Sequence, residues 1–215
     1  MQIEEWAQRW AEGKIGFHEG RPNTLLDAHV AELGAPGDRR RVFVPLCGKT
    51  EDMAFLVARG HEVVGIEAVE PAVAAFFAEH GLTPTIERGP RGLVFYRAPG
   101  ITILSGDVFA ATAEDLDGVN ALYDRAAMVA LPEDVRPRYV AHLRAILPAA
   151  SPCLLVTFDY DQARIAGPPF AVSEAEVRRL YDGAMVTLLA TQNGAGAKFE
   201  SAGIPATESC YRVEL

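Results

Sequence analysis

An acidic side chain, Glu67, ends the second of two short apolar segments that are spaced like the first strands of an α/β domain. The first segment, residues 42–44, stops at Pro45 and Gly48, and a helix-like pattern follows. An acid at the end of a second strand, about 20 residues after the first turn, typically accepts hydrogen bonds from the ribose of a nucleoside. A solvated acid at a strand end explains Glu67 alone equally well.

The turn after the first segment lacks the glycines that bind phosphate groups. Gly48 is the only glycine in residues 41–50, so the G-x-G-x-x-G fingerprint of dinucleotide-binding proteins is missing. Phe43 occupies the position at which a P-loop has its first glycine. We therefore expect a ligand that carries a nucleoside without phosphate, and S-adenosylmethionine is the obvious candidate. The missing glycines disfavour the alternative, a nicotinamide-dependent oxidoreductase.

Two further groups of residues follow later apolar segments. Asp107 and Val108 follow residues 101–105, where a polar–apolar pair could recognise the edge of an adenine; a turn residue followed by a core residue is the alternative. Asp124 and Arg125 leave the next predicted strand. Charged residues at the carboxyl end of a central strand point into the crevice where open α/β sheets bind ligands. The alternative for this pair is a surface ion pair or the start of a helix.

The overall composition excludes several classes of protein. The 215 residues carry a formal net charge of −9 and a pI of about 5.1, which argues against general nucleic-acid binding. No apolar run approaches a membrane span, and the acidic N-terminus has no signal-peptide pattern. The three cysteines and five histidines are not spaced as metal ligands or as a disulfide framework. We expect a cytoplasmic protein with no metal, membrane or nucleic-acid partner.

Alternating apolar segments and helical patterns predict a single domain over residues 1–215, with residues 1–40 as an N-terminal helical lid or extension and residues 41–215 as the core. Five strand–helix units followed by two strands predict an α/β fold, with a mostly parallel, seven-stranded central sheet, an antiparallel edge and helices on both faces. The expected strands are 42–46, 62–66, 93–97, 101–105, 119–123, 153–158, 186–192 and 207–214, of which 93–97 and 101–105 form a hairpin or two adjacent strands. The expected helices are 3–12, 24–33, 50–59, 71–80, 132–147 and 173–181.

Four blocks of sequence carry a more specific pattern. They are Trp6-x-x-x-Trp10-x-x-Gly13 with residues 15–18 (IGFH), residues 41–49 (RVFVPLCGK), residues 60–67 (GHEVVGIE) and residues 123–126 (YDRA). In these blocks, and at residues 167–170 (GPPF), the chain resembles the bacterial thiopurine S-methyltransferases. The resemblance runs nearly from end to end. It implies a Rossmann-like class I methyltransferase fold, S-adenosyl-L-methionine as the methyl donor with S-adenosyl-L-homocysteine as the product, and a sulfur, selenium or tellurium acceptor.

The resemblance also implies roles for single positions on the donor side. Trp10 would lie near the sulfonium of the donor, as a cation held by an aromatic face; a plain hydrophobic stripe with Trp6 is the alternative. Leu46 would contact the methionine part through its backbone, in a turn that Gly48 shapes. Glu67 would accept both ribose hydroxyls. Asp107 and Val108 would meet the adenine, Val108 through its main chain.

On the acceptor side, the resemblance implies that Arg125 lies beside the acceptor and the donor carboxylate, as the candidate catalytic residue. Phe17 and His18 would help to close the pocket, although packing within the loop explains His18 almost as well. Lys198 stands where the mammalian enzymes have a second arginine that is tied to the thiopurine. Because lysine keeps the charge but loses the bidentate fork, this departure weighs against thiopurine as the physiological acceptor.

The expected reaction is a direct in-line transfer of the methyl group to a soft nucleophile, with the N-terminal helix as a lid. Such acceptors ionise near neutral pH, so no strong general base is required, and proximity and alignment supply most of the rate. The expected acceptor class spans thiopurines, small thiols, and selenium or tellurium species. A non-catalytic protein that keeps the donor pocket is the remaining alternative. The family implies a monomer.

Overall fold

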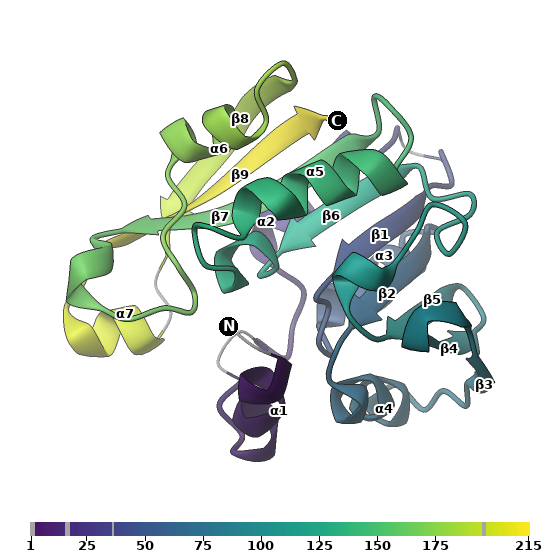
Figure 1. The fold of residues 1–215 in the computed structure, drawn as a ribbon. Coiled ribbons are helices and arrows are strands. Elements are labelled where there is room, and N and C mark those ends of the chain that lie inside the picture. Colours follow the sequence, from purple (N-terminus) through teal and green to yellow (C-terminus); the bar gives the residue numbers. More distant parts are fainter. Residues whose placement is uncertain (1–2, 16–17, 36, 195–196) are drawn as a thin grey trace.

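The computed structural model describes residues 3–15, 18–35, 37–194 and 197–215, and within α7 it describes the side chains of Phe199, Ser201 and Ala202. These residues form a sheet of nine strands in the order β3-β4-β5-β2-β1-β6-β7-β9-β8 (Figure 1). The strands are β1 (Arg41–Pro45), β2 (Glu62–Glu67), β3 (Thr85–Arg88), β4 (Val94–Ala98), β5 (Ile101–Ser105), β6 (Ala121–Arg125), β7 (Pro152–Tyr160), β8 (Met185–Asn193) and β9 (Ala206–Glu214).

The core of the sheet is parallel, and both of its edges are antiparallel. Strands β5, β2, β1, β6 and β7 run parallel to one another, whereas the pairs β7–β9 and β9–β8 at one edge and β5–β4 and β4–β3 at the other are antiparallel. The mostly parallel core with an antiparallel edge is confirmed, but the expected number of seven strands is wrong, since nine strands lie within the described residues. Strand β3 was not predicted, because its four residues are all exposed and have no apolar stripe.

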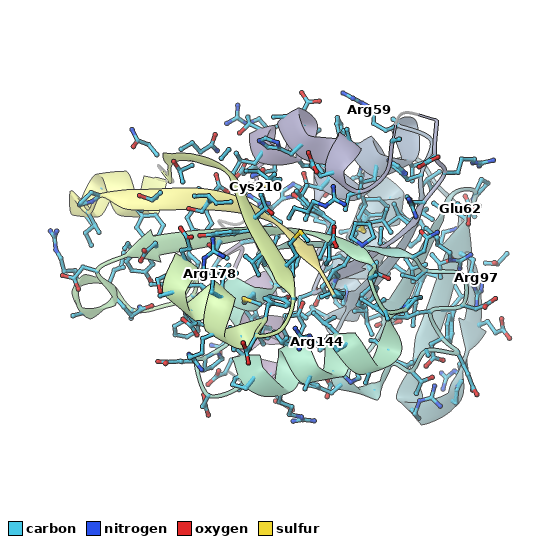
Figure 2. All side chains as sticks on the ribbon, turned by 90° about the horizontal axis from the view of Figure 1, so that it is seen from above. Arg59, Glu62, Arg97, Arg144, Arg178 and Cys210 are labelled. Atoms are coloured by element: carbon cyan, nitrogen blue, oxygen red, sulfur yellow. The ribbon has the colours of Figure 1, made fainter. Side chains whose placement is uncertain are left out.

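Helices cover both faces of the sheet, as predicted, because successive side chains of a strand point to opposite faces. Phe43 of β1 packs in a cluster with Tyr139 and Leu143, whereas its neighbours Val42 and Val44 pack with Leu26 and Met53. One face therefore carries α5 (Arg136–Ile146) and α6 (Glu174–Leu180), and the other carries α2 (Thr24–His29), α3 (Glu51–Ala58) and α4 (Glu70–Glu79). Figure 2 shows Arg144 on α5 and Arg59, which follows α3, on opposite sides of the sheet.

Strand β1 marks the point at which the strand order reverses. Strand β2 lies on one side of it and β6 on the other, and each continues to its own edge of the sheet. In open α/β sheets, ligands bind outside the carboxyl ends of the strands at such a switch point. The structure places β6 at Ala121–Arg125, two residues later than the predicted strand 119–123. Asp124 and Arg125 are therefore the last residues of a buried strand.

The two ends of the chain carry additional helices. Helix α1 (Ile3–Ala11) has no buried residue, and it lies off the sheet on the side toward which β6 points (Figure 1). Helix α7 (Ala197–Ala202) lies between β8 and β9, where no helix was predicted. Its Phe199 packs against Tyr160 and Ile204 in a small separate cluster. None of the helices in the described parts of the chain is both long and apolar enough to cross a membrane.

Candidate functional site

The turn after β1 adopts a backbone conformation that few side chains favour. Leu46 has a φ of 46° and Gly48 has a φ of 53°, both in the left-handed region. The turn is fixed between them, since the Cys47 N–H donates to the Ile66 carbonyl oxygen at 3.0 Å. A leucine held in this region is strained, and such strain is concentrated at functional sites. The turn therefore presents the Leu46 backbone at the carboxyl end of β1.

Cys47 does not act as a nucleophile in this turn. Its side chain is only 5% exposed, and burial raises the pKa of the thiol well above its usual range, with the charge of Glu67 as a second cause. Because the thiolate is the reactive form, a cysteine in this environment is inert. Cys47 is a small buried residue that lines the turn.

Glu67 connects the turns that follow three neighbouring strands. One carboxylate oxygen accepts the Gly48 N–H at 2.8 Å, and the other accepts the Val69 N–H at 2.8 Å. The Glu67 carbonyl accepts the Gly106 N–H at 2.9 Å, directly before Asp107. Burial raises the pKa of Glu67, and the backbone N–H groups partly oppose this shift. Glu67 is 8% exposed, so the alternative of a solvated acid is wrong.

The turn after β5 places an exposed acid beside a buried apolar residue. The Asp107 side chain accepts the Phe109 N–H at 3.0 Å and so caps a short 3-10 helix, Val108–Ala110, while Val108 is 6% exposed. Nε2 of His142, on α5, lies 2.9 Å from the Val108 carbonyl oxygen. The polar–apolar pair predicted from the sequence thus has one polar residue at the surface and one apolar residue fixed by α5.

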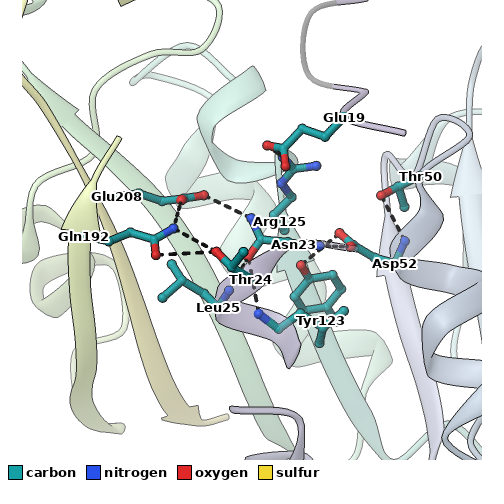
Figure 3. A network of polar contacts seen from close by, with 11 residues as sticks. Glu19, Asn23, Thr24, Leu25, Thr50, Asp52, Tyr123, Arg125, Gln192 and Glu208 are labelled. Atoms are coloured by element: carbon teal, nitrogen blue, oxygen red, sulfur yellow. Dashed lines mark hydrogen bonds and ion pairs between the residues drawn. The ribbon is translucent and has the colours of Figure 1, made fainter. Parts of the chain in front are cut away.

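Arg125 ends β6 and is 8% exposed. The parallel register pairs Val42 with Ala121 and Phe43 with Leu122, and its continuation brings Arg125 level with Leu46. Its guanidinium forms an ion pair with Glu19, from the loop before α2 (Figure 3). Burial by itself lowers the pKa of Arg125, but nearby Tyr123, Asp52, Glu19 and Glu208 raise it overall.

Around Arg125, a buried polar network joins the N-terminal segment, α3, β6 and β9. The Asn23 N–H donates to Oδ1 of Asp52 at 2.7 Å, and Nδ2 of Asn23 donates to Oε1 of Glu208 at 3.2 Å. The Tyr123 hydroxyl donates to Oδ2 of Asp52 at 2.9 Å, and Nε2 of Gln192 donates to Glu208 at 2.7 Å (Figure 3). Segments far apart in the sequence are thus held around one guanidinium.

Asp124 points away from Arg125, into the face that α5 covers. It is fully buried, and its carboxylate accepts the Met128 N–H at 3.0 Å and the Tyr139 hydroxyl at 2.8 Å. Burial raises the pKa of Asp124 to about 6, although these donors oppose the shift. The alternative of a surface Asp–Arg pair is therefore wrong, because consecutive strand residues face opposite sides.

Comparison with known proteins identifies the family. The model of the family described as thiopurine S-methyltransferase matches residues 1–214. The chain belongs to the thiopurine S-methyltransferase family. A thiopurine S-methyltransferase of Pseudomonas paraeruginosa is 52% identical over 181 residues, which cover 84% of this chain and 82% of the relative. That of Pseudomonas fluorescens is 45% identical over 218 residues, or 99% of each chain.

The fold of this thiopurine S-methyltransferase family member also matches solved methyltransferase structures. The 1,6-didemethyltoxoflavin-N1-methyltransferase of Burkholderia thailandensis, solved with S-adenosylhomocysteine, has a TM-score of 0.60 at 18% identity. The match covers 98% of this chain and 86% of that structure. The protein is an enzyme that uses S-adenosylmethionine for S-methylation, as the sequence blocks implied. The buried acid at the end of β2 and the glycine-poor turn fit a donor without phosphate groups.

The other predicted residues of the methyltransferase site belong to the N-terminal segment and to α7. Trp10 is half-buried in α1. His18 is half-buried, and its Nδ1 has no hydrogen-bond partner among the described residues. Phe17 lies outside the described residues, as does the side chain of Lys198 in α7. Within the described part of the chain, no group of three or more His, Cys, Asp or Glu residues could hold a metal ion.

The acidic residues around Arg125 were not predicted from the sequence. These acids come from three separate parts of the chain: Glu19 from the N-terminal loop, Asp52 from the first turn of α3, and Glu208 from β9. The contact between Glu19 and Arg125 joins residues 106 positions apart, and the contact between Asn23 and Glu208 joins residues 185 positions apart. Only Asn23 carries a local signal, since an asparagine directly before a helical pattern is a typical N-cap. It does cap α2, with its side chain accepting from the Leu25 and Leu26 N–H groups.

Proposed function

We propose that this methyltransferase transfers the methyl group directly to a sulfur, selenium or tellurium atom of a small acceptor, with Arg125 as its central residue. The observation that carries the proposal is the placement of Arg125. It is buried at the carboxyl end of β6, level with the strained turn at Leu46, and Glu67 lies across β1. A cation beside the donor site is suited to bind the donor carboxylate and to favour the anionic form of an acceptor.

We assign the donor-binding groups along the ends of β1, β2 and β5. Each oxygen of Glu67 accepts one backbone N–H, and a carboxylate oxygen has a second lone pair that can accept a ribose hydroxyl. Asp107 and the Val108 main chain would meet the adenine. Since His142 already contacts the Val108 carbonyl, the N–H of Val108 is the group that we assign to the base. The Leu46 backbone, in a turn shaped by Gly48, would contact the methionine part.

We assign the N-terminal segment, residues 1–40, as a lid on a core formed by residues 41–215 within one domain. Helix α1 buries none of its own residues, and Trp10 is half-buried on it. An aromatic face near the sulfonium would stabilise the cation, and closure over the site would exclude water. Helix α1 is therefore expected to close over the site when the donor binds.

S-adenosylmethionine supplies a methyl group on a positively charged sulfur. The lone pair of the acceptor chalcogen forms the new bond to the methyl carbon, and the electrons of the old carbon–sulfur bond return to the donor sulfur, which becomes the neutral thioether of S-adenosylhomocysteine. A thiol acceptor loses its proton to water before the transfer, so no general base is needed near neutral pH. The chain contributes alignment and charge, through Arg125 above all.

For the acceptor, we propose a small thiol, a thiopurine, or a related selenium or tellurium compound. The relatives are named for thiopurines. The remaining candidates for acceptor contacts are Phe17, His18 and Lys198. Lys198 would offer a point charge to the acceptor, where an arginine would offer a bidentate fork. We further propose that the enzyme is cytoplasmic, because its three cysteines are too widely spaced for a disulfide framework, and that it is a monomer, as the family implies.

A methylation assay over sulfur, selenium and tellurium acceptors tests this proposal, together with thermal unfolding in the presence of S-adenosylhomocysteine or NAD(H). We expect S-adenosylhomocysteine to raise the melting temperature, because a compound that binds the native state stabilises the protein against unfolding. We expect NAD(H), which should not bind, to leave the melting temperature unchanged. Stabilisation by NAD(H) would favour an oxidoreductase. Stabilisation by S-adenosylhomocysteine without turnover of any acceptor would favour a non-catalytic binding protein.

A further inference from the structure

The ion pair between Arg125 and Glu19 has no part in the proposed reaction. Glu19 lies in the loop before α2, and its carboxylate meets Nη2 of Arg125 (Figure 3). The Arg125 side chain is 6% exposed, whereas that of Glu19 is 36% exposed, so one partner is buried and the other is accessible to solvent. A ligand that approaches Arg125 therefore meets a carboxylate that is already in place.

The fold itself places Glu19 at this position. Four residues after Glu19, Asn23 is anchored by its N–H to Asp52 at 2.7 Å and by its side chain to Glu208 at 3.2 Å. Asn23 is 2% exposed and Asp52 is fully buried. Because this anchor does not involve Glu19, the loop is held near Arg125 even when the ion pair is absent.

The charges of two further carboxylates, Asp52 and Glu208, raise the pKa of the same guanidinium. Asp52 and Glu208 are buried, and the hydrogen bonds described above give them neutral donors: Asn23 and Tyr123 for Asp52, and Asn23 and Gln192 for Glu208. Together with Glu19, three carboxylates therefore surround one cation. Arg125 therefore already has carboxylates beside it before any acceptor binds, and among the described side chains no further cation is assigned to an additional negative charge on the acceptor.

We propose that Glu19 is a specificity-determining residue that excludes acceptors with a fixed negative charge beyond the reacting chalcogen. The inference rests on the proposed role of Arg125 beside the acceptor. A neutral acceptor brings no charge, and the single negative charge of a simple thiolate faces the positive sulfonium of the donor and is neutralised by the methyl transfer. An acceptor with an additional carboxylate or phosphate brings a second charge, and Glu19 repels it at short range in a partly buried site. The preferred acceptors are then apolar thiols and their selenium or tellurium analogues.

Glu19→Gln tests the inference, because glutamine keeps an oxygen that can accept from Arg125 and removes the charge. Two acceptors with the same ring and thiol, 4-mercaptobenzoate and its methyl ester, differ in one carboxylate. We expect the wild type to show the higher kcat/KM with the ester, and Glu19→Gln to raise the carboxylate-to-ester ratio roughly tenfold. The matched control is Glu62→Gln, which removes the same charge at the exposed start of β2, where Glu62 pairs with Arg41 at 3.3 Å.

The affinities of both benzoates for enzyme saturated with S-adenosylhomocysteine give the same ratio without turnover. If the ester is methylated and the ratio in Glu19→Gln stays within about twofold of the wild-type value, the role of Glu19 is overturned and the proposed function stands. If the binding ratio shifts as expected in an enzyme that methylates neither compound, the role of Glu19 is supported and the proposed acceptor chemistry is contradicted. An equal shift in Glu62→Gln would also overturn the inference, because the effect would then reflect net charge alone.

Discussion

The carboxylate of Glu67 accepts the backbone N–H of Gly48 at 2.8 Å, and this bond ties the end of β2 to the turn after β1. One buried side chain thus shapes the turn and, in our proposal, binds the donor ribose. A carboxylate can do both because its two oxygens offer more acceptor sites than the two backbone N–H groups occupy. Structural support and ligand recognition are therefore coupled at this residue.

Glu67→Gln is expected to weaken both functions. An amide has one acceptor oxygen, so either the Gly48 or the Val69 N–H would face an NH2 group and lose its partner. We expect the free energy of unfolding to fall by about 1–3 kcal/mol and the Kd for S-adenosylhomocysteine to rise at least about tenfold, since charge-assisted hydrogen bonds are lost. Urea unfolding and isothermal titration calorimetry measure the two effects. Unchanged donor affinity would contradict the ribose assignment, and Glu62→Gln on the same strand should change neither value.

Arg125→Lys is expected to keep the fold and lose most of the turnover. Lysine keeps a positive charge among Glu19, Asp52 and Glu208 but lacks the planar fork that holds two ligands at once. We expect kcat to fall on the order of a hundredfold, while Arg59→Lys on the surface leaves it unchanged. Arg125→Ala should in addition lower the free energy of unfolding by about 3–5 kcal/mol, because it leaves buried carboxylates without their cation. An Arg125→Ala enzyme with full activity and normal donor binding would refute its central role.

Asp124→Asn is expected to change the pH dependence of stability. Burial raises the pKa of Asp124 from 3.8 to about 6, so between these values the native state binds more protons than the unfolded state. Stability from this group is therefore highest at low pH and falls as the pH rises toward 6, by about 1.4 kcal/mol per unit. Urea unfolding between pH 4 and 7 should show a smaller loss of stability with rising pH for Asp124→Asn than for the wild type, with the difference arising between about pH 4 and 6. The exposed Asp117→Asn serves as the control, and equal slopes in all three proteins would contradict the shift.

Gly65→Ala tests how tightly the donor turn packs on β2. A Cβ at Gly65 would lie 2.8 Å from Sγ of Cys47 and 3.1 Å from Sδ of Met53. We expect a loss of about 1–3 kcal/mol in the free energy of unfolding from overpacking. In the double variant Gly65→Ala/Cys47→Ala the sulfur is removed, so the loss should be smaller than the sum of the single changes by more than about 0.5 kcal/mol. If the losses in free energy of unfolding are additive, the contact with Sγ of Cys47 is not the cause of the destabilisation by Gly65→Ala.

Local features of the sequence determined much of the parallel core. Apolar runs of strand length, the first stopping at Pro45 and the second ending in Glu67, predicted β1 and β2, and the helical patterns that follow each run predicted α3 and α4. Those signals are strong because a doubly covered strand must be apolar throughout. Strand β3 escaped prediction for the opposite reason, since an exposed edge strand needs no apolar stripe.

The same contrast holds for the site. The role of Glu67 as a ribose-binding acid could be predicted because it ends the second strand about 20 residues after the first turn. The glycine-poor turn argued against a phosphate ligand before any family resemblance was considered. The limits of β6 could not be predicted: the strand ends two residues later than expected, so Asp124 and Arg125 are buried strand residues on opposite faces and do not follow the strand as a pair.

The partners of Arg125 were decided by the tertiary structure alone. Glu19, Asp52 and Glu208 are ordinary surface-type residues in the sequence, and they converge only because the N-terminal loop, α3 and β9 pack against the end of β6. Strand and helix periodicity arises from neighbours within a few positions, so the sequence displays it directly. The charge balance around a buried cation depends on contacts more than a hundred positions apart, which exist only once the chain has folded.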